Sequence, residues 1–212
     1  MCGRYSLSSS TNSLEQHFNL VQSVAYQPRY NITPGTLVPV IKLVDGKRVM
    51  ANHYWGLVPH WASDTKLQPI NARAEAVDQK PFFRSAFRKS RCLVPANGFY
   101  EWQRTEGKRK QPYYSRLLDS EILAFAGLHE HWEKDGRVID SCAIITTDAN
   151  NTMAKIHSRM PVILKPGDYD NWLETGSKVL LQTYAGEMLA YEVSTAVNNP
   201  ENNDRSLLEP VS

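Results

Sequence analysis

Runs of β-branched and aromatic residues, bounded by turn residues, recur along the chain and predict a protein dominated by β-strands. The clearest pair is formed by residues 37–44 and 49–57, because the Asp45-Gly46 turn between them supplies the positive φ values of a tight hairpin. Further strands are predicted at residues 91–94, 98–103, 112–117, 123–130, 138–147, 162–164 and 189–194.

Short helices are predicted between these strands. Asn12 and Glu15 resemble a capping box that opens a helix carrying Leu14 and Phe18. The other predicted helices cover residues 72–77, 82–89, 151–156 and 169–174, and the predicted loops cover residues 29–35 and 198–203. The order of elements predicts an α+β fold of largely antiparallel sheets that curl like a barrel, with short helices interspersed.

The length of 212 residues, with 42% hydrophobic and 22% charged residues, is typical of one folded domain in water. We find no internal repeat or linker, and expect a single domain over residues 1–212 whose last ten or so residues form a loose tail. No segment approaches the roughly 18 apolar residues of a membrane span, and the N-terminus lacks a secretory signal. A cytoplasmic monomer is expected.

Cysteine and histidine usage argues against a metal or other cofactor. The three cysteines, Cys2, Cys92 and Cys142, include no CxxC pair, and the six histidines are scattered. We therefore expect free thiols, no metal and no cofactor.

Charge is informative only locally, since the net charge is +2. No acidic residue lies between Asp78 and Glu101, and the predicted helix at 82–89 has one basic and one apolar side. The basic residues of this segment are Lys80, Arg84, Arg88, Lys89 and Arg91, beside Phe82, Phe83 and Phe87. This pattern fits either a solvated surface helix or a nucleic-acid contact.

The first dipeptide, Met1-Cys2, carries the most distinctive chemistry. Removal of Met1 would leave Cys2 with a free α-amine, whose pKa of about 7.7–8.0 keeps a useful fraction uncharged at neutral pH. The free thiol, with a pKa near about 8.5, would also ionise readily. Together they can convert an aldehyde first into an imine and then into a five-membered thiazolidine ring. The alternative is an incidental cysteine at a frayed terminus.

Three polar residues in compact segments could serve this chemistry. Asn71 could hold the amine or stabilise an oxyanion, and Glu101, between aromatic neighbours, could act as acid and base. His157 could transfer protons near neutrality. Each also has a purely structural interpretation: a helix cap for Asn71, a surface strand residue for Glu101 and a loop histidine for His157.

Six ordered motifs resemble those of the SOS response-associated peptidase family and span nearly the whole chain. They are Cys2-Gly3-Arg4-Tyr5, Arg29-Tyr30-Asn31, Trp55-Gly56-Leu57-Val58-Pro59 with Trp61, Asn71-Ala72-Arg73-Ala74-Glu75, Gly98-Phe99-Tyr100-Glu101-Trp102 and His157-Ser158-Arg159-Met160-Pro161. The resemblance implies autocatalytic removal of Met1 and covalent capture of abasic sites in single-stranded DNA during the DNA damage response, with limited turnover and lyase-type Schiff-base chemistry.

By position in these motifs, the resemblance implies that Cys2 is the nucleophile, that Asn71 orients its amine, and that Glu101 and His157 transfer protons. It also implies DNA contacts by Arg4, Asn31, Pro34, Trp61, Arg73, Thr146 and Arg159. Ala62 stands where some family members carry a second aromatic residue, so one stacking surface is absent. We expect Trp55, Trp102 and Trp132 to pack in the core. When bound to DNA, the protein would lie with the nucleoid.

Two other classes share parts of this pattern. Glutamine amidotransferases of the N-terminal nucleophile type also begin Met-Cys-Gly, but we find neither their glutamine-recognition segments nor a second domain. A non-catalytic single-strand binding module could use the basic helix and Trp61 without any covalent step.

Overall fold

The computed structural model describes residues 2–104 and 110–211. The strands are β1 (Tyr5–Leu7), β2 (Arg29–Ile32), β3 (Leu37–Val44), β4 (Lys47–Trp55), β5 (Asn71–Arg73), β6 (Arg91–Ala96), β7 (Gly98–Arg104), β8 (Lys110–Leu117), β9 (Leu123–Lys134), β10 (Arg137–Asp148), β11 (Arg159–Pro161), β12 (Ile163–Leu164) and β13 (Met188–Glu192). The helices are α1 (Thr11–Phe18), α2 (Pro81–Lys89) and α3 (Tyr169–Thr175), with the short 3-10 helices η1 (Met153–Lys155), η2 (Pro166–Asp168), η3 (Lys178–Leu180), η4 (Thr195–Asn198) and η5 (Arg205–Leu208).

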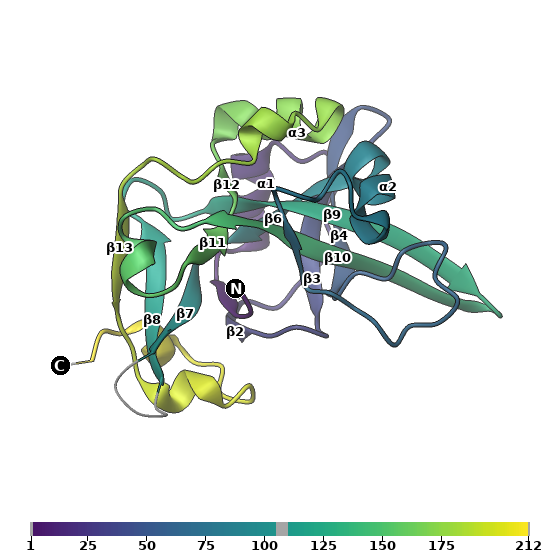
Figure 1. Ribbon diagram of the computed structural model, residues 1–212. Coiled ribbons are helices and arrows are strands. Elements are labelled where there is room, and N and C mark those ends of the chain that lie inside the picture. The colour runs from purple at the N-terminus through teal and green to yellow at the C-terminus, as the bar shows by residue number, and fades with distance from the viewer. Residues whose placement is uncertain (1, 105–109, 212) are drawn as a thin grey trace.

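Two sheets build the molecule and confirm the predicted α+β class. One has the strand order β13-β8-β7-β1-β2. In the other, the order β10-β4-β3-β6-β9 closes on itself because β9 also pairs with β10, which makes a barrel. Most pairings are antiparallel, and β10 runs parallel to β4 and β5. The N-terminus lies between the two sheets, while α1, α2 and α3 gather at one end of the barrel (Figure 1).

The predicted hairpin is confirmed as β3 and β4, which pair over their whole length. Asp45 and Gly46 form the turn at φ values of 51° and 71°, the left-handed conformations that a tight hairpin turn requires. Around it, the core is apolar and aromatic. Tyr5 packs edge-on against Trp55, with 5.2 Å between the ring centroids, and both side chains are fully buried.

Two helix predictions need correction. Residues 72–77 do not form a helix, because Asn71–Arg73 is drawn into the sheet as β5 beside β10 and a turn follows. Of residues 151–156, only Met153–Lys155 is helical, as the 3-10 helix η1. The predicted helices at 82–89 and 169–174 are confirmed by α2 and α3.

Helix α1 begins at a different cap from the predicted one. The Ser10 hydroxyl accepts a hydrogen bond from the Ser13 N–H at 3.1 Å, so the N-cap lies two residues before Asn12. Glu15 accepts instead from the hydroxyl of Ser23. Leu14, the central apolar residue of the helix, is fully buried as expected.

Strands with weak sequence signals account for the remaining differences. The predicted loop at 29–35 begins with β2, which pairs with β1, and neither β1 nor β11 was predicted. At the other end of the chain, the expected loose tail is packed. Leu207 of η5 is 1% exposed, and the Val211 N–H donates to the Glu192 carbonyl oxygen at 3.0 Å.

Within residues 2–104 and 110–211, no helix has the length and apolar character to cross a bilayer. The same residues contain no group of three His, Cys, Asp or Glu side chains arranged to hold a metal ion. All three cysteines are free and buried.

A buried histidine in β4 should make the barrel sensitive to acid. His53 is 1% exposed, lies 5.4 Å from the ring of His129, and has no ordinary hydrogen bond to either ring nitrogen among the described residues. Burial and the charge of Lys42 lower the pKa of His53 to about 4, although Asp140 opposes the shift. Between this value and the ordinary pKa of histidine, His53 is therefore protonated in the unfolded chain and neutral in the folded protein.

We expect this histidine to cost the protein about 2 kcal/mol of unfolding free energy between pH 7 and pH 5, since its pKa rises toward its ordinary value on unfolding. In urea unfolding, the free energy of unfolding of His53→Leu should fall between pH 7 and pH 5 by about 2 kcal/mol less than that of the wild type. Equal acid sensitivity in His53→Leu and wild type would contradict the assignment.

Candidate active site

Strand pairing brings the start of the chain to Glu101. Strand β1 pairs antiparallel with β7 with Tyr5 opposite Phe99, and continuing this register places Gly3 opposite Glu101. The Tyr100 N–H donates to the Arg4 carbonyl oxygen at 2.9 Å, which shows that the register does continue. A short first strand thus holds Cys2 beside a carboxyl group.

Asn71 contacts Cys2 directly. Its Nδ2 donates to the Cys2 carbonyl oxygen at 2.8 Å, and its own position is set by β5, where Asn71 pairs with Ile144 of β10. The Asn71 Oδ1 atom is buried and accepts no hydrogen bond from the described residues. This side chain therefore holds the backbone of Cys2 and keeps an acceptor free for a nearby donor.

Glu101 is 3% exposed in the middle of β7. Burial raises the pKa of its carboxyl group, and the nearby His157 acts in the opposite direction. A carboxyl group with a raised pKa stays protonated closer to neutral pH, so it can donate a proton and take it back.

His157 is placed by the turn that contains η1. The Asn150 side chain caps this turn by accepting from the Met153 N–H at 2.9 Å, and the His157 N–H donates to the Met153 carbonyl oxygen at 2.8 Å. The imidazole Nδ1 accepts from the Arg159 N–H at 3.0 Å and lies 3.2 Å from the Arg159 carbonyl oxygen. Both backbone polar groups of Arg159 therefore face His157 Nδ1.

The Cys2 thiol differs from the sequence-based expectation. We expected it to ionise readily, but the side chain is fully buried. Burial raises its pKa well above the ordinary value, and the negative charge of Glu101 raises it further. The thiol is therefore held neutral, and its reaction requires a base to take the proton.

An open cleft of about 660 Å³ reaches two of these four groups. Glu101 and His157 line it, with Trp102, Lys155 and Ser158 among its other residues. We expected Trp102 to be a core residue, but it is half-buried. Its Nε1 donates to Asn198 Oδ1 at 2.8 Å, and its ring lies 5.8 Å from the Arg4 guanidinium. Trp55 and Trp132 are buried as expected.

Several predicted DNA contacts are occupied by the protein itself. Asn31 is fully buried, and its Nδ2 donates to the carbonyl oxygens of Val197, Asn199 and Asn202. Thr146 is also fully buried, with its hydroxyl 3.4 Å from the Ala72 carbonyl oxygen. In this arrangement neither side chain can reach a ligand, so their predicted role in DNA binding would need a rearrangement.

The predicted arginine contacts differ in availability. Arg4 is half-buried and donates to Asn31 at 2.7 Å and to the Val197 carbonyl oxygen at 2.6 Å. Arg159 is held by carboxylates, with 14% of its side chain exposed. Arg73 is exposed on β5 and forms no side-chain hydrogen bond to another described residue, so it alone of the three is ready to meet phosphate.

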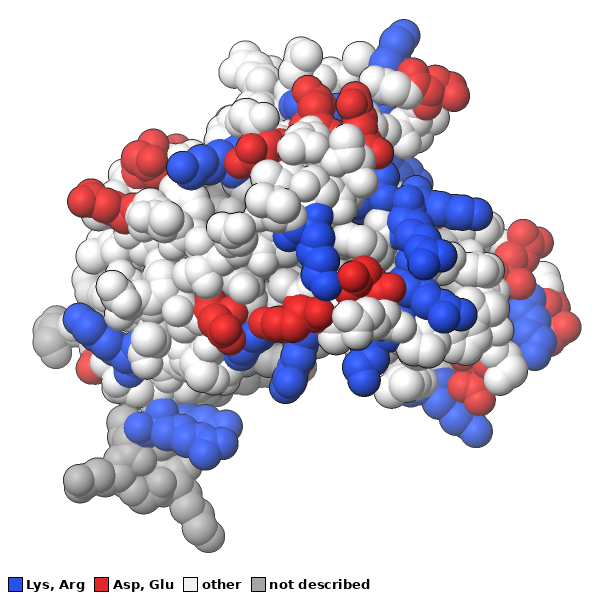
Figure 2. Space-filling view, turned by 45° about the horizontal axis from the view of Figure 1, so that its top comes forward, with Lys and Arg blue, Asp and Glu red and all other residues white. Residues whose placement is uncertain are grey.

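A basic groove lies between α2 and the loop that carries Trp61. Trp61 is 53% exposed and lies edge-on to Phe82, with ring centroids 6.0 Å apart. The groove is lined by His60, Trp61, Pro81, Arg84, Ser85, Arg88 and Lys89. Figure 2 shows Lys and Arg side chains gathered on the α2 side of the molecule. Pro34, the remaining predicted contact, is half-buried in the loop after β2.

The fold and these side chains define an α+β barrel protein in which an amide, a carboxyl group and an imidazole gather near its second residue. Residues 1–200 match the family model described as SOS response associated peptidase (SRAP). The chain belongs to this family, as its motifs suggested.

Relatives and solved structures agree with this assignment. The abasic site processing protein YoqW of Bacillus subtilis (strain 168) is 40% identical and aligns over 99% of both chains. The abasic site processing protein YedK of Escherichia coli (strain K12) is 28% identical over the full length of both. A crystal structure of a protein from Bacteroides thetaiotaomicron matches all of both chains with a TM-score of 0.90 at 28% identity.

The sequence-based assignment missed two residues of the polar network around the site, Glu75 and Asp148. Both carboxylates bind Arg159. Glu75 lies within the motif that begins at Asn71, and this position could have marked it as a residue near the site. Asp148, at the end of a long buried strand, had no local signal.

Proposed function

We propose that this protein captures abasic sites in single-stranded DNA through Cys2, after it has removed its own Met1. The observation that carries the proposal is the convergence of Cys2, Asn71, Glu101 and His157 from four separate segments of the chain. The names of its relatives, abasic site processing proteins, support the same substrate.

The reaction would proceed in two bonding steps. The uncharged α-amine of Cys2 adds to the aldehyde carbon of the ring-opened sugar, and the resulting carbinolamine loses water to leave an imine. Protonated Glu101 supplies the proton that leaves with the hydroxyl group. The nitrogen keeps its remaining proton, so an iminium stands beside the Glu101 carboxylate. Cys2 Sγ then bonds to the iminium carbon, the C=N electron pair returns to nitrogen, and the Glu101 carboxylate takes the thiol proton and is protonated again. The balance is a thiazolidine and one water.

Each neighbour of Cys2 has a role in the proposed reaction. Asn71 holds the Cys2 backbone at 2.8 Å, and its free Oδ1 is the acceptor that can orient the α-amine. His157, whose charge affects Glu101, exchanges a proton with that carboxyl group. The buried, neutral thiol is protected from oxidation until an imine forms beside it.

The flanking strand would bind along the basic groove. Arg84, Arg88 and Lys89 offer cations to phosphates, and Trp61 offers a ring face on which a base can stack. None of these contacts reads a base, so binding should be independent of sequence. Arg73 would hold a phosphate nearer the lesion.

We expect the double variant Arg84→Ala, Arg88→Ala to bind single-stranded DNA more weakly and with less dependence on salt. Losing two phosphate contacts should reduce the slope of log K against log salt by about 1.4. Fluorescence anisotropy over a salt series measures this slope. Arg205→Ala, an exposed cation of η5, is the matched control. An unchanged slope in the double variant would show that DNA does not bind along the basic groove.

Intact mass spectrometry tests the proposed function. The purified protein is measured alone and after incubation with a single-stranded oligonucleotide carrying one abasic site, with an undamaged oligonucleotide as control. We expect loss of Met1 and a heat-stable adduct to the abasic strand only. Retention of Met1 or the absence of an adduct would refute the proposal, and glutaminase and DNA-binding assays would then separate the two alternative classes.

A further inference from the structure

The cleft that holds Glu101 and His157 has two walls, which come from distant parts of the chain. One wall is formed by residues 101–104 of β7 with Lys110 of β8, and the other by the turn at residues 155–158. Glu101 lies on the first wall and His157 on the second. Proton exchange between the two side chains therefore depends on the distance between the walls.

Gln103 joins the two walls. It follows Glu101 by two residues on β7, so both side chains lie on the same face of the strand. Gln103 Nε2 donates to the Lys155 carbonyl oxygen at 2.7 Å. The Tyr113 hydroxyl on β8 donates to Gln103 Oε1 at 3.3 Å and to Glu192 Oε1 at 2.8 Å. Because the amide oxygen faces this hydroxyl, the amide nitrogen is the end that faces the turn.

The Lys155 carbonyl oxygen lies on the short stretch of backbone that leads into His157. Lys155 is the last residue of η1, and the Ile156 and His157 N–H groups both donate to the Met153 carbonyl oxygen, at 2.9 and 2.8 Å. Met153 is buried, and its Sδ accepts from the Ser115 hydroxyl on β8 at 3.2 Å. The start of the turn is thereby fixed, and a shift of the Lys155 peptide is passed on to His157.

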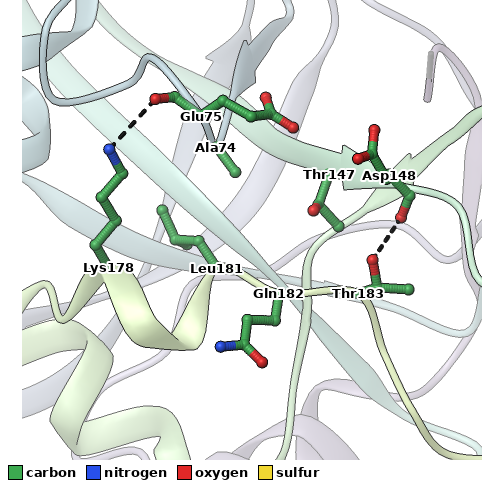
Figure 3. A pocket seen from close by; sticks show the side chains of 8 residues that line it. All are labelled: Ala74, Glu75, Thr147, Asp148, Lys178, Leu181, Gln182 and Thr183. Carbon is green, nitrogen blue, oxygen red and sulfur yellow. Dashed lines mark hydrogen bonds between the residues drawn. The ribbon is translucent and has the colours of Figure 1, made fainter.

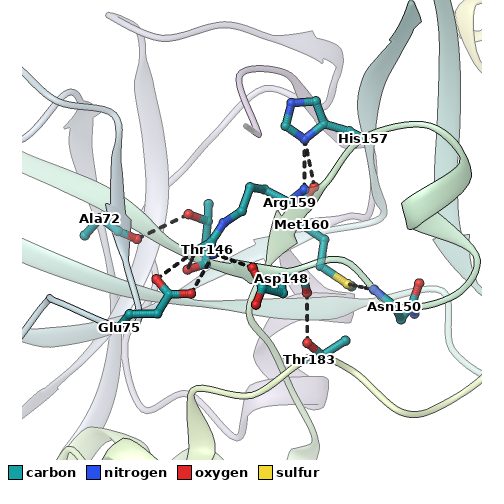
Figure 4. A network of polar contacts seen from close by, with 9 residues as sticks. All are labelled: Ala72, Glu75, Thr146, Asp148, Asn150, His157, Arg159, Met160 and Thr183. Atoms are coloured by element: carbon teal, nitrogen blue, oxygen red, sulfur yellow. Dashed lines mark hydrogen bonds and ion pairs between the residues drawn. The ribbon is translucent and has the colours of Figure 1, made fainter.

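The two ends of the turn are held by parts of the molecule other than β7. Before the turn, the Thr183 hydroxyl donates to the Asp148 carbonyl oxygen of β10 at 2.8 Å (Figure 3). The Asn150 N–H donates to Met160 Sδ of β11 at 3.4 Å (Figure 4). These contacts fix the ends against β10 and β11, whereas Gln103 binds the middle of the turn to the strand that carries the carboxyl group.

We propose that Gln103 is a positioning residue, which binds the turn to β7 and keeps His157 within reach of Glu101 for proton transfer. This inference rests on the proposed function for its effect on the rate of capture. Gln103 lies outside the basic groove, so its loss should slow the chemical step and leave the affinity for DNA unchanged. A residue with only a structural role would lower rate and affinity together.

Three variants separate the hydrogen bond from the bulk of the side chain. Gln103→Met keeps the length of the side chain but has no donor for the Lys155 carbonyl oxygen, and Gln103→Lys restores a donor. Gln111→Met is the matched control, because Gln111 lies directly opposite Gln103 on β8. Its Nε2 donates to the carbonyl oxygens of Pro112 and Val193 instead of the turn. Thermal unfolding shows whether each variant is folded.

The first test needs no DNA and measures how strongly His157 acts on Glu101. The charge of His157 lowers the pKa of the Glu101 carboxyl group, so His157→Gln should raise it. Carboxyl ¹³C NMR follows this pKa, with the signal assigned by its loss in Glu101→Gln. The Cys2 thiol, which also faces this carboxyl group, is present in every variant.

We expect His157→Gln to raise the Glu101 pKa less in the Gln103→Met background than in the wild-type or Gln111→Met background, because the imidazole is then farther from the carboxyl group. An equal rise in the Gln103→Met and wild-type backgrounds would overturn the proposal.

The second test measures rate and affinity separately. At saturating abasic oligonucleotide, Gln103→Met should form the adduct about tenfold more slowly than the wild type, and Gln103→Lys should recover most of the lost rate. The Kd of Gln103→Met for undamaged single-stranded DNA should equal that of the wild type and of Gln111→Met. In a His157→Gln background, Gln103→Met should cause no further slowing, because both changes act through one residue. A wild-type rate in Gln103→Met, equal slowing in Gln103→Lys, or parallel loss of rate and affinity would contradict the positioning role.

The two tests separate failure of this proposal from failure of the proposed function. If the wild type forms no adduct but the effect of His157 on Glu101 depends on Gln103, the positioning role stands and the proposed function fails. If the adduct forms and that effect is independent of Gln103, the proposed function stands and the positioning role is wrong.

Discussion

Replacing Cys2 by alanine should abolish the heat-stable adduct completely. Without Sγ the imine carbon has no second nucleophile, so an imine is the final product and hydrolyses on heating. If the thiol also drives removal of Met1, Cys2→Ala will keep its methionine and will not form even an imine. Intact mass of the variant, with and without borohydride reduction, distinguishes these two losses.

Cys2→Ser is the matched variant, since it changes one buried atom and preserves the packing around residue 2. It should also give no heat-stable thiazolidine, while thermal unfolding should show that it remains folded. A heat-stable adduct in either variant would show that another residue forms the covalent bond.

Glu101→Gln should slow adduct formation by about 10²- to 10³-fold, because the amide can neither donate the proton that leaves with water nor take the thiol proton. Burial raises the pKa of Glu101, so the wild-type carboxyl stays protonated to a higher pH than a free glutamate. The wild-type rate should therefore fall as pH rises through that pKa. Single-turnover rates across pH should lack this fall in Glu101→Gln.

Stability separates this role from a structural one. Because the fold disfavours the Glu101 carboxylate, its ionisation costs stability above the pKa of about 4.3 of a free glutamate. Glu101→Gln removes that cost, so at pH 8 the variant should be at least as stable as the wild type. Glu130→Gln, another buried acid that pairs with His60, is the control and should react at the wild-type rate. A destabilised Glu101→Gln variant would indicate a packing role.

Local signals were sufficient where a segment's conformation depends on its own residues. The hairpin of β3 and β4 was predictable because Asp45 and Gly46 dictate its turn. Helix α2 was predictable from its apolar and basic sides. The segment at 72–77 has helix-forming alanines, yet its first residues form strand β5, which pairs with β10. No local pattern reports such a distant partner.

The candidate site shows the same division. Cys2, Asn71, Glu101 and His157 could be chosen from their motifs, since each motif presents the residue type that the chemistry requires. Their convergence depends on the β1–β7 register and on the turn at η1, both of which involve long-range pairing. The raised pKa of the Cys2 thiol also appears only when burial is known.

The sequence by itself determined the α+β class and the family and predicted Cys2 as the reactive residue, because turn chemistry, hydrophobic pattern and ordered motifs are local properties. Only the tertiary structure decided which residues are available. It buries Asn31 and Thr146, and it binds Arg159 to Glu75 and Asp148. The physical reason is that burial, charge pairing and hydrogen-bond partners depend on contacts between segments far apart in the chain, which the fold alone brings together.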